Sequence, residues 1–182
     1  MTKNTKLYGD SLYELALEQE KAGIKGYSKM LLEQLEIVNM LFNENPDYVR
    51  LLQEPSIQRK IRLGLIDEAF GMKAEEYLIS FLKILCEQEL LSEFAGCLQE
   101  YKQRYQKDNN IAEAHVVSAV ALNDEQKKAL KEKLEEVWKK EIILITKVNP
   151  GLIGGISVEI EGRQVDGSVR GRLEKLHRLM QK

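Results

Sequence analysis

The first hundred residues place hydrophobic side chains at the spacing of amphipathic helices. Apolar residues recur three, four and seven positions apart within residues 12–17, 31–42, 57–65, 77–85 and 94–105, with polar residues between them. Glycine, asparagine and proline separate these segments, as is typical where helices end. Five or six amphipathic helices with short connections predict a helical bundle.

The first of these segments is apolar on two neighbouring faces. Asp10 or Ser11 is expected to cap the helix at its N-terminus. The apolar positions are Leu12, Leu15 and Ala16 on one face and Tyr13 and Leu17 on the other.

The hydrophobic period changes from 3.6 to 2 after residue 106. The polar run at residues 106–110 predicts a linker or turn at this point. We therefore expect two domains, a helical bundle over residues 1–106 and a small mixed domain over residues 107–182.

The second half of the chain predicts strands and helices in alternation. Residues 112–122 and 141–148 are rich in β-branched side chains, as strands are, and residues 124–140 predict a charged helix between them. A hairpin over residues 155–169 and a helix over residues 168–180 complete a β-α-β-β-α unit. The expected fold class is α+β, a helical bundle followed by a small mixed α/β domain.

Composition excludes several classes of protein. The chain is 43% hydrophobic and 31% charged, and its net charge of −2 provides no overall basic field for non-specific nucleic-acid binding. Its longest aliphatic run, Ile142–Ile145, is far shorter than the roughly 18–20 residues that span a bilayer. The start lacks the apolar region of a secretory signal, and the two cysteines fit a reducing cytoplasm.

Charge is distributed unevenly between the two halves. Residues 1–106 carry 13 Lys and Arg against 17 Asp and Glu, whereas residues 107–182 carry 14 against 12. The final stretch, residues 163–182, holds six basic and two acidic residues. The two halves therefore offer different electrostatic surfaces to partners.

Residue types that carry catalysis do not cluster in the sequence. His115 and His177 lie in different predicted elements, and neither has metal-ligand spacing to Cys86 or Cys97. The glycine-containing segment 149–157 lacks the lysine of a phosphate-binding loop and leads into a strand rather than a helix. We expect no catalytic residue, no cofactor and no metal ion.

The most informative motif lies in residues 149–180. Its turn and cap positions are Pro150, Gly154, Gly155, Asp166, Gly167 and Ser168. The glycines allow tight turns or close backbone approach, and aspartate or serine can cap a following helix. That helix has an apolar stripe flanked by basic residues. The stripe either closes its own domain or contacts a partner helix with acidic flanks.

This segment resembles the C-terminal signature of the delta subunit of bacterial F-type ATP synthases, the counterpart of the mitochondrial oligomycin-sensitivity-conferring protein. The signature contains Asp-Pro-x-Leu-Ile-Gly-Gly, a short hairpin, and Asp-Gly-Ser-Val-Arg-x-Arg-Leu before a leucine-bearing helix. The matching residues are Pro150, Leu152, Ile153, Gly154, Gly155, Asp166, Gly167, Ser168, Val169, Arg170, Arg172, Leu173 and Leu176. Asn149 stands where the family usually has aspartate.

The resemblance continues through the rest of the chain. Residues 8–16, YGDSLYELA, are similar to the family's opening Tyr-Ala-x-Ala-Leu-Phe-Glu-Leu-Ala, with Gly9 in place of alanine. Residues 117–126 resemble the family's entry from strand to helix. The resemblance therefore spans nearly the whole sequence.

Membership of this family implies a peripheral-stalk subunit that sits on the catalytic head and has no cofactor of its own. The helical domain would receive the N-terminal helix of an alpha subunit of the alpha/beta head, and the C-terminal domain would bind the distal ends of the b subunits. One copy per complex would lie at the cytoplasmic face of the cell membrane and contact the membrane only through the complex. ATP, magnesium and the coupling ion would belong to other subunits.

The resemblance also implies contact residues for each partner. The expected alpha-subunit contacts are Tyr13, Leu17, Leu78, Phe81 and Leu82. The same side chains could instead only fill the bundle. The expected b-subunit contacts are Arg170, Leu173, Lys175, Leu176, Arg178 and Leu179.

Two other classes of function compete with this interpretation. A helical RNA-binding or transcription-associated module would use the basic C-terminal stretch, but the bundle is acidic and lacks interleaved aromatic and basic residues. A small metabolic enzyme would need a catalytic cluster, which the sequence does not show. We expect no nucleic-acid partner.

Reversing the charge of Arg170, Lys175 and Arg178 is expected to weaken binding to the b subunit, because acidic flanks on that partner would then be repelled. Titration with the C-terminal segment of the b subunit measures the effect. Affinity that stays unchanged across the set contradicts an electrostatic contribution.

Overall fold

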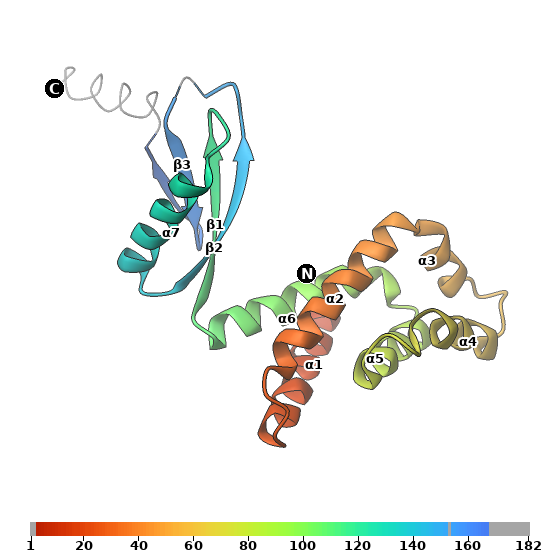
Figure 1. Ribbon diagram of the computed structural model, residues 1–182. Helices are drawn as coiled ribbons and strands as arrows, with labels where there is room; N and C mark the ends of the chain where they lie inside the picture. The colour runs from red at the N-terminus through yellow and green to blue at the C-terminus, as the bar shows by residue number, and fades with distance from the viewer. Residues whose placement is uncertain (1–2, 153, 168–182) are drawn as a thin grey trace. The chain divides into compact units, whose positions relative to one another are not determined.

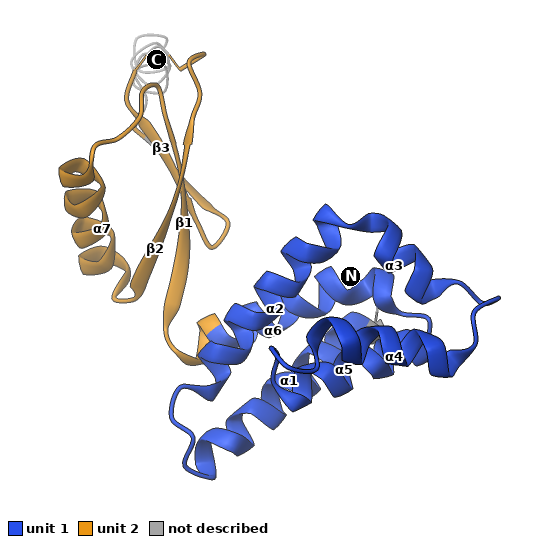
Figure 2. Cartoon of the chain, turned by 45° about the vertical axis from the view of Figure 1, so that its right-hand side comes forward, with its two compact units in different colours: residues 1–105 blue, residues 106–182 orange. Residues whose placement is uncertain are grey.

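The computed structural model describes residues 3–152 and 154–167 and divides the chain into two compact units, Met1–Tyr105 and Gln106–Lys182 (Figures 1 and 2). We call them the helical unit and the sheet unit. Helices fill the first, and a four-stranded mixed sheet with a helix fills the second. This arrangement confirms the expected α+β fold class.

The described part of the helical unit consists of α-helices with one short 3-10 helix among them. They are α1 (Lys3–Lys21), α2 (Tyr27–Glu44), α3 (Pro46–Gln53), α4 (Arg59–Phe70), α5 (Glu76–Glu87), η1 (Leu91–Glu93) and α6 (Phe94–Asp108). Their apolar faces meet in one continuous core. Pro46 occupies the first position of α3, where its fixed φ suits a helix and its missing N–H is not needed.

Helix α1 buries residues from both of the apolar faces that the sequence suggested. Leu12, Tyr13 and Ala16 are buried, but Leu15 is 40% exposed. The expected cap at Asp10 or Ser11 is also wrong, because α1 already begins at Lys3. Asp10 instead lies within the helix, where its carboxylate pairs with Arg104 of α6 at 3.1 Å.

Two glycines allow α1 and α6 to lie very close together. A Cβ atom on Gly9 would lie 2.7 Å from both the Cys97 carbonyl oxygen and the Glu100 Cβ atom. On the opposite helix, a Cβ atom on Gly96 would lie 2.7 Å from the Thr5 methyl group. Real side-chain atoms cannot approach so closely, so this contact requires the absence of a side chain at both positions.

Tyr13 and Tyr101 complete this helix–helix contact. Their rings meet edge to face with centroids 5.2 Å apart, an arrangement that aromatic pairs favour. The Tyr101 hydroxyl donates a hydrogen bond of 2.9 Å to the Ser28 carbonyl oxygen of α2. Burial raises the pKa of Tyr101 well above its usual value, so the phenol stays protonated and remains a donor. The contact therefore joins three helices.

The sheet unit has the strand order β2-β1-β3-β4. Its elements are β1 (Ile111–Ser118), α7 (Asp124–Trp138), β2 (Glu141–Val148), β3 (Ile156–Ile160) and β4 (Arg163–Asp166). Strands β1 and β2 are parallel and are connected through α7, whereas β3 and β4 pair in antiparallel fashion. A capping box at Asn123 and Gln126 fixes the start of α7.

One face of this sheet packs against α7. Its buried residues are Ala112, Ala114, Val116, Ile142, Val158 and Ile160, with Leu130, Leu134 and Trp138 of α7 packed against them. Alternate residues of each strand point to the other face, as strand geometry requires. The expected helix over residues 168–180 lies outside the described residues.

The linker or turn expected over residues 106–110 is shorter than the sequence suggested, a turn at residues 109 and 110. Helix α6 continues to Asp108 and β1 begins at Ile111, so only two residues connect them. Asn110 adopts a left-handed conformation, with φ of 55°, and its side-chain amide donates to the Lys139 carbonyl oxygen at 2.9 Å. Its own carbonyl oxygen accepts from the Glu141 amide at 3.0 Å. The connection is therefore fixed to the start of the sheet.

Two glycine substitutions are expected to change stability in opposite directions. Gly9→Ala should lower the free energy of unfolding by about 1–3 kcal/mol, because the new methyl group overlaps α6. Gly64→Ala in α4 should raise it by about 0.5–1 kcal/mol, because no atom lies within 4 Å and alanine favours the helix. Chemical denaturation measures both, and a stabilised Gly9 variant would contradict the close approach.

Candidate partner-binding surfaces

Most of the residues expected to contact an alpha subunit lie inside the helical unit. Tyr13, Leu78 and Leu82 are fully buried, and Phe81 is almost so. The Phe81 ring lies 6.3 Å from that of Phe94 across the core. Side chains in these positions stabilise the bundle and present almost no surface, which favours the interpretation that they fill it. Among the five, only Leu17 is partly exposed, at the edge of the core.

The same two helices carry other apolar side chains on their outer faces. Leu15 of α1 is 40% exposed, and Tyr77 and Ile84 of α5 are 37% and 46% exposed. The Gln19 amide donates to the Tyr77 hydroxyl at 3.0 Å, which places the end of α1 beside the start of α5. We call Leu15, Tyr77 and Ile84 the α1–α5 surface, since Leu15 lies on the same side of α1 as Gln19, whereas Leu17 points to another side.

Sequence reasoning missed the members of this surface because each is the immediate neighbour of a buried residue. Tyr77 precedes Leu78, and Ile84 precedes Leu85, so both belong to the same apolar run as the core. Their spacing of seven places them on one helix face, rotated from the buried face by about one residue. That spacing is the signal that could have identified them.

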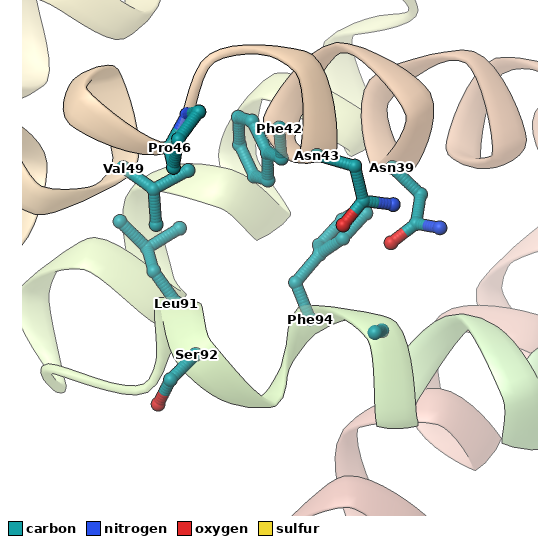
Figure 3. A pocket seen from close by; sticks show the side chains of 9 residues that line it. Asn39, Phe42, Asn43, Pro46, Val49, Leu91, Ser92 and Phe94 are labelled. Carbon is teal, nitrogen blue, oxygen red and sulfur yellow. The ribbon is translucent and has the colours of Figure 1, made fainter.

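A cleft of about 200 Å³ lies on one side of α2, between α2 and the start of α6. The rings of Phe42 and Phe94 lie between these helices with Asn39 and Asn43 beside them (Figure 3). The two ring centroids are 5.3 Å apart. The cleft is thus lined by two aromatic rings and by the side-chain amides of Asn39 and Asn43, which can donate and accept hydrogen bonds.

Two further clefts of about 180 and 250 Å³ lie on the other side of α2, next to α4. They share Leu41, Ala69 and Phe70 and form a continuous apolar groove. Ile37 lines one end of it and Tyr48 the other. Burial raises the pKa of Tyr48 to about 12, and its hydroxyl donates to the Leu65 carbonyl oxygen at 3.0 Å.

The glycine motif of the sheet unit forms the turn after β2 and the open end of the β3–β4 hairpin. The Asn149 side chain accepts a hydrogen bond from the Gly151 amide at 3.0 Å, so asparagine serves in this turn after Val148. Gly155 has a φ of 85°, which favours glycine. Beside it, just after β4, the Gly167 amide donates to the Ile156 carbonyl oxygen at 3.0 Å and so extends the pairing at the open end of the hairpin.

The remaining motif residues are placed only in part. Pro150 lies in the exposed turn and Gly154 in the bend before β3, while Asp166 is the last residue of β4 and pairs with Ser157. Ser168 and the expected b-subunit contacts lie outside the described residues. These are Arg170, Leu173, Lys175, Leu176, Arg178 and Leu179.

Burial raises the pKa of both cysteines and of several tyrosines in the helical unit. Burial raises the pKa of Cys97 to about 11 and that of Tyr27 to about 12, and it also raises the pKa of Cys86. The Cys86 thiol donates to the Leu52 carbonyl oxygen at 3.3 Å. Both thiols therefore stay protonated at physiological pH. Since the thiolate is the reactive form of cysteine, both are unreactive in the folded chain.

The part of the chain that the structure describes contains neither a metal-binding cluster nor a membrane-spanning helix. Within residues 3–152 and 154–167, no three acidic, histidine or cysteine side chains gather closely enough to bind a metal ion. No helix in the same part of the chain has the length and apolar character needed to cross a membrane.

The fold is that of a two-unit α+β protein in which a helical bundle precedes a small mixed sheet. A chain of the mitochondrial ATP synthase hexamer of Toxoplasma gondii, determined by cryo-EM, has the same fold. The TM-score is 0.71 at 15% sequence identity, over 100% of this chain and 99% of that chain.

Sequence comparison identifies the family. The chain belongs to the ATP synthase delta (OSCP) subunit family, whose pattern matches residues 5–180. ATP synthase subunit delta of Lachnoclostridium phytofermentans is 28% identical over 173 residues, covering 94% of this chain and 92% of that protein. The corresponding subunit of Clostridium kluyveri is 27% identical over 175 residues, with coverage of 96% and 93%. The resemblance found in residues 149–180 is thereby confirmed, and the chain is a structural subunit of an ATP synthase.

Two substitutions in α5, three residues apart, are expected to differ in their effect on stability because one residue is buried and the other exposed. Phe81→Ala should lower the free energy of unfolding by about 3–5 kcal/mol, because it leaves a cavity in the core. Ile84→Ala should change it by about 0.5 kcal/mol or less, because much of its side chain is already in solvent. Urea denaturation followed by circular dichroism measures both, and similar losses for the two variants would contradict this assignment.

Proposed function

We propose that this chain is the peripheral-stalk subunit that ties the catalytic alpha/beta head of an ATP synthase to its b-subunit stator. The observation that carries the proposal is the family match, which runs from residue 5 to residue 180 and so covers both units. The helical unit and the sheet unit have separate hydrophobic cores, so each can present a binding surface of its own. A tether needs such an arrangement, with one surface for each partner.

The helical unit binds the N-terminal helix of an alpha subunit through the α1–α5 surface. A partner helix docks by inserting apolar side chains that recur every three or four residues, and it needs an apolar surface that the fold leaves open. Leu15, Tyr77 and Ile84 supply one, and a partly exposed tyrosine beside aliphatic groups is typical of residues that dominate binding energy. The buried residues Tyr13, Leu78, Phe81 and Leu82 support this surface from beneath.

The C-terminal residues bind the distal ends of the b subunits. Leu173, Leu176 and Leu179 would supply apolar contacts at helical spacing. Arg170, Lys175 and Arg178 would meet acidic flanks of the b helices, which would steer association and fix the register.

The action of the subunit is mechanical. Rotation of the central shaft exerts torque on the head, and the tether resists it so that proton or sodium flow drives ATP synthesis. Two interfaces of ordinary size suffice if each dissociates slowly compared with turnover. The subunit would act as one copy per complex at the cytoplasmic face of the cell membrane, with no cofactor and no membrane contact of its own.

Binding measurements on surface variants test the head-binding part of the proposal. Leu15→Asp and Ile84→Asp should each weaken binding of an alpha-subunit N-terminal peptide about tenfold or more, because a charge would be placed in an apolar interface. Ile61→Asp on α4 is the matched control, since Ile61 is exposed outside the α1–α5 surface. Calorimetric titration measures each affinity.

The pattern among the variants decides the outcome. Weakened binding for Leu15→Asp and Ile84→Asp with unchanged binding for Ile61→Asp supports the α1–α5 surface. Unchanged binding for both test variants contradicts it, and failure of the unmodified chain to bind either the alpha peptide or the b subunit contradicts the tether itself.

A further inference from the structure

Strand β2 forms an open edge of the sheet in the described part of the chain. It is the end strand in the order β2-β1-β3-β4 and runs for eight residues. Ile143 and Ile145 are 43% and 39% exposed on it. A long edge strand with apolar side chains is a template on which another strand can pair.

The backbone of β2 presents hydrogen-bonding groups to this edge. The amides of Glu141 and Asn149 donate to carbonyl oxygens of Asn110 and Ser118, so odd-numbered amides face β1. Alternation along the strand therefore turns the amides of even-numbered residues outward. The first of these, Ile142, donates to the Glu135 carboxylate at 3.1 Å. Leu144, Thr146 and Val148 thus offer their amides and carbonyls at the edge.

The side chains of β2 are complementary to a reversed copy of the same strand. The face turned away from α7 carries Glu141, Ile143, Ile145 and Lys147, all exposed. If two β2 strands pair antiparallel about Leu144, Glu141 of each lies opposite Lys147 of the other, and Ile143 lies opposite Ile145. These opposite positions are non-hydrogen-bonded pairs, in which side chains approach most closely.

No neighbouring register gives this match. Centring the pair on Ile145 places Glu141 opposite Asn149 and Ile143 opposite Lys147, which leaves each charge without an opposite charge. A parallel pairing in register would place like charges side by side, which is unfavourable. The exposed side chains of β2 therefore favour pairing with a second copy of β2, in the antiparallel orientation centred on Leu144.

We propose that two copies of the free chain associate through β2, antiparallel about Leu144, and so join two four-stranded sheets into one. The two-fold axis runs perpendicular to the sheet, so both α7 helices lie on the same face. The contact is self-complementary, as two-fold symmetry requires. The proposal depends only on β2 and is independent of the proposed role in ATP synthase.

Sedimentation equilibrium of the full chain, from low micromolar to near-millimolar concentration, tests the proposal. The unmodified chain should shift from the mass of one chain to that of two. Lys147→Glu should raise the dissociation constant about tenfold or more, because two symmetry-related pairs change from attraction to repulsion. The double variant Glu141→Lys with Lys147→Glu should restore the affinity to within about threefold, since the pairs are re-formed with the charges exchanged.

Two further variants distinguish pairing through β2 from other causes of dimer formation. Lys128→Glu on α7 makes the same charge change at an exposed position outside β2 and should leave the dissociation constant unchanged. Thr146→Pro removes an outward amide, a change that edge strands tolerate, and should give a folded single chain by circular dichroism. The proposal is overturned if the unmodified chain stays single throughout, if the double variant is no tighter than Lys147→Glu, or if folded Thr146→Pro still forms dimers.

Discussion

The contact between α1 and α6 determines which side chains of the helical unit remain outside. Gly9 and Gly96 have no side chains, so the two helices lie nearly backbone to backbone. At this separation Tyr13 must point inward against Tyr101, whose hydroxyl then reaches Ser28 of α2. Rotating α1 to bury Tyr13 leaves Leu15 on the outer surface. The apolar surface available to a partner is therefore a consequence of the packing inside.

A similar relation holds in the sheet unit. Helix α7 covers one face of the sheet, and the parallel connection through it leaves β2 at the edge. The Glu135 carboxylate of α7 accepts a hydrogen bond from the Ile142 amide, the first outward-facing amide of β2. The next three outward-facing amides, those of Leu144, Thr146 and Val148, lie along the edge of the sheet. Each unit thus buries a core of its own and leaves a defined apolar feature uncovered, a helix face in one and a strand edge in the other.

The sequence predicted the elements well because their hydrophobic periods are clear, and β2 was predicted with its observed ends at Glu141 and Val148. It could not predict which face of α1 is buried, since apolar residues occupy most of that helix from Leu12 to Leu17 and the choice depends on Gly9 meeting α6. The linker or turn expected over residues 106–110 is a turn at residues 109 and 110 only, because residues 106–108 are polar but continue α6, and lysine and glutamine favour helices as well as loops. The exposed apolar residues of α5 that we propose as partner contacts were missed for a related reason. Tyr77 and Ile84 adjoin core residues, and only the packed bundle distinguishes the two faces.

The central claim is that this chain joins two larger assemblies of an ATP synthase, and recovery of its partners tests that claim most directly. The tagged chain would be purified from detergent-solubilised membranes of its own host, and the proteins that accompany it identified by mass spectrometry. The account predicts that alpha, beta and b subunits are recovered together with ATPase activity. Recovery of RNA or unrelated proteins, with no synthase subunits, would contradict it.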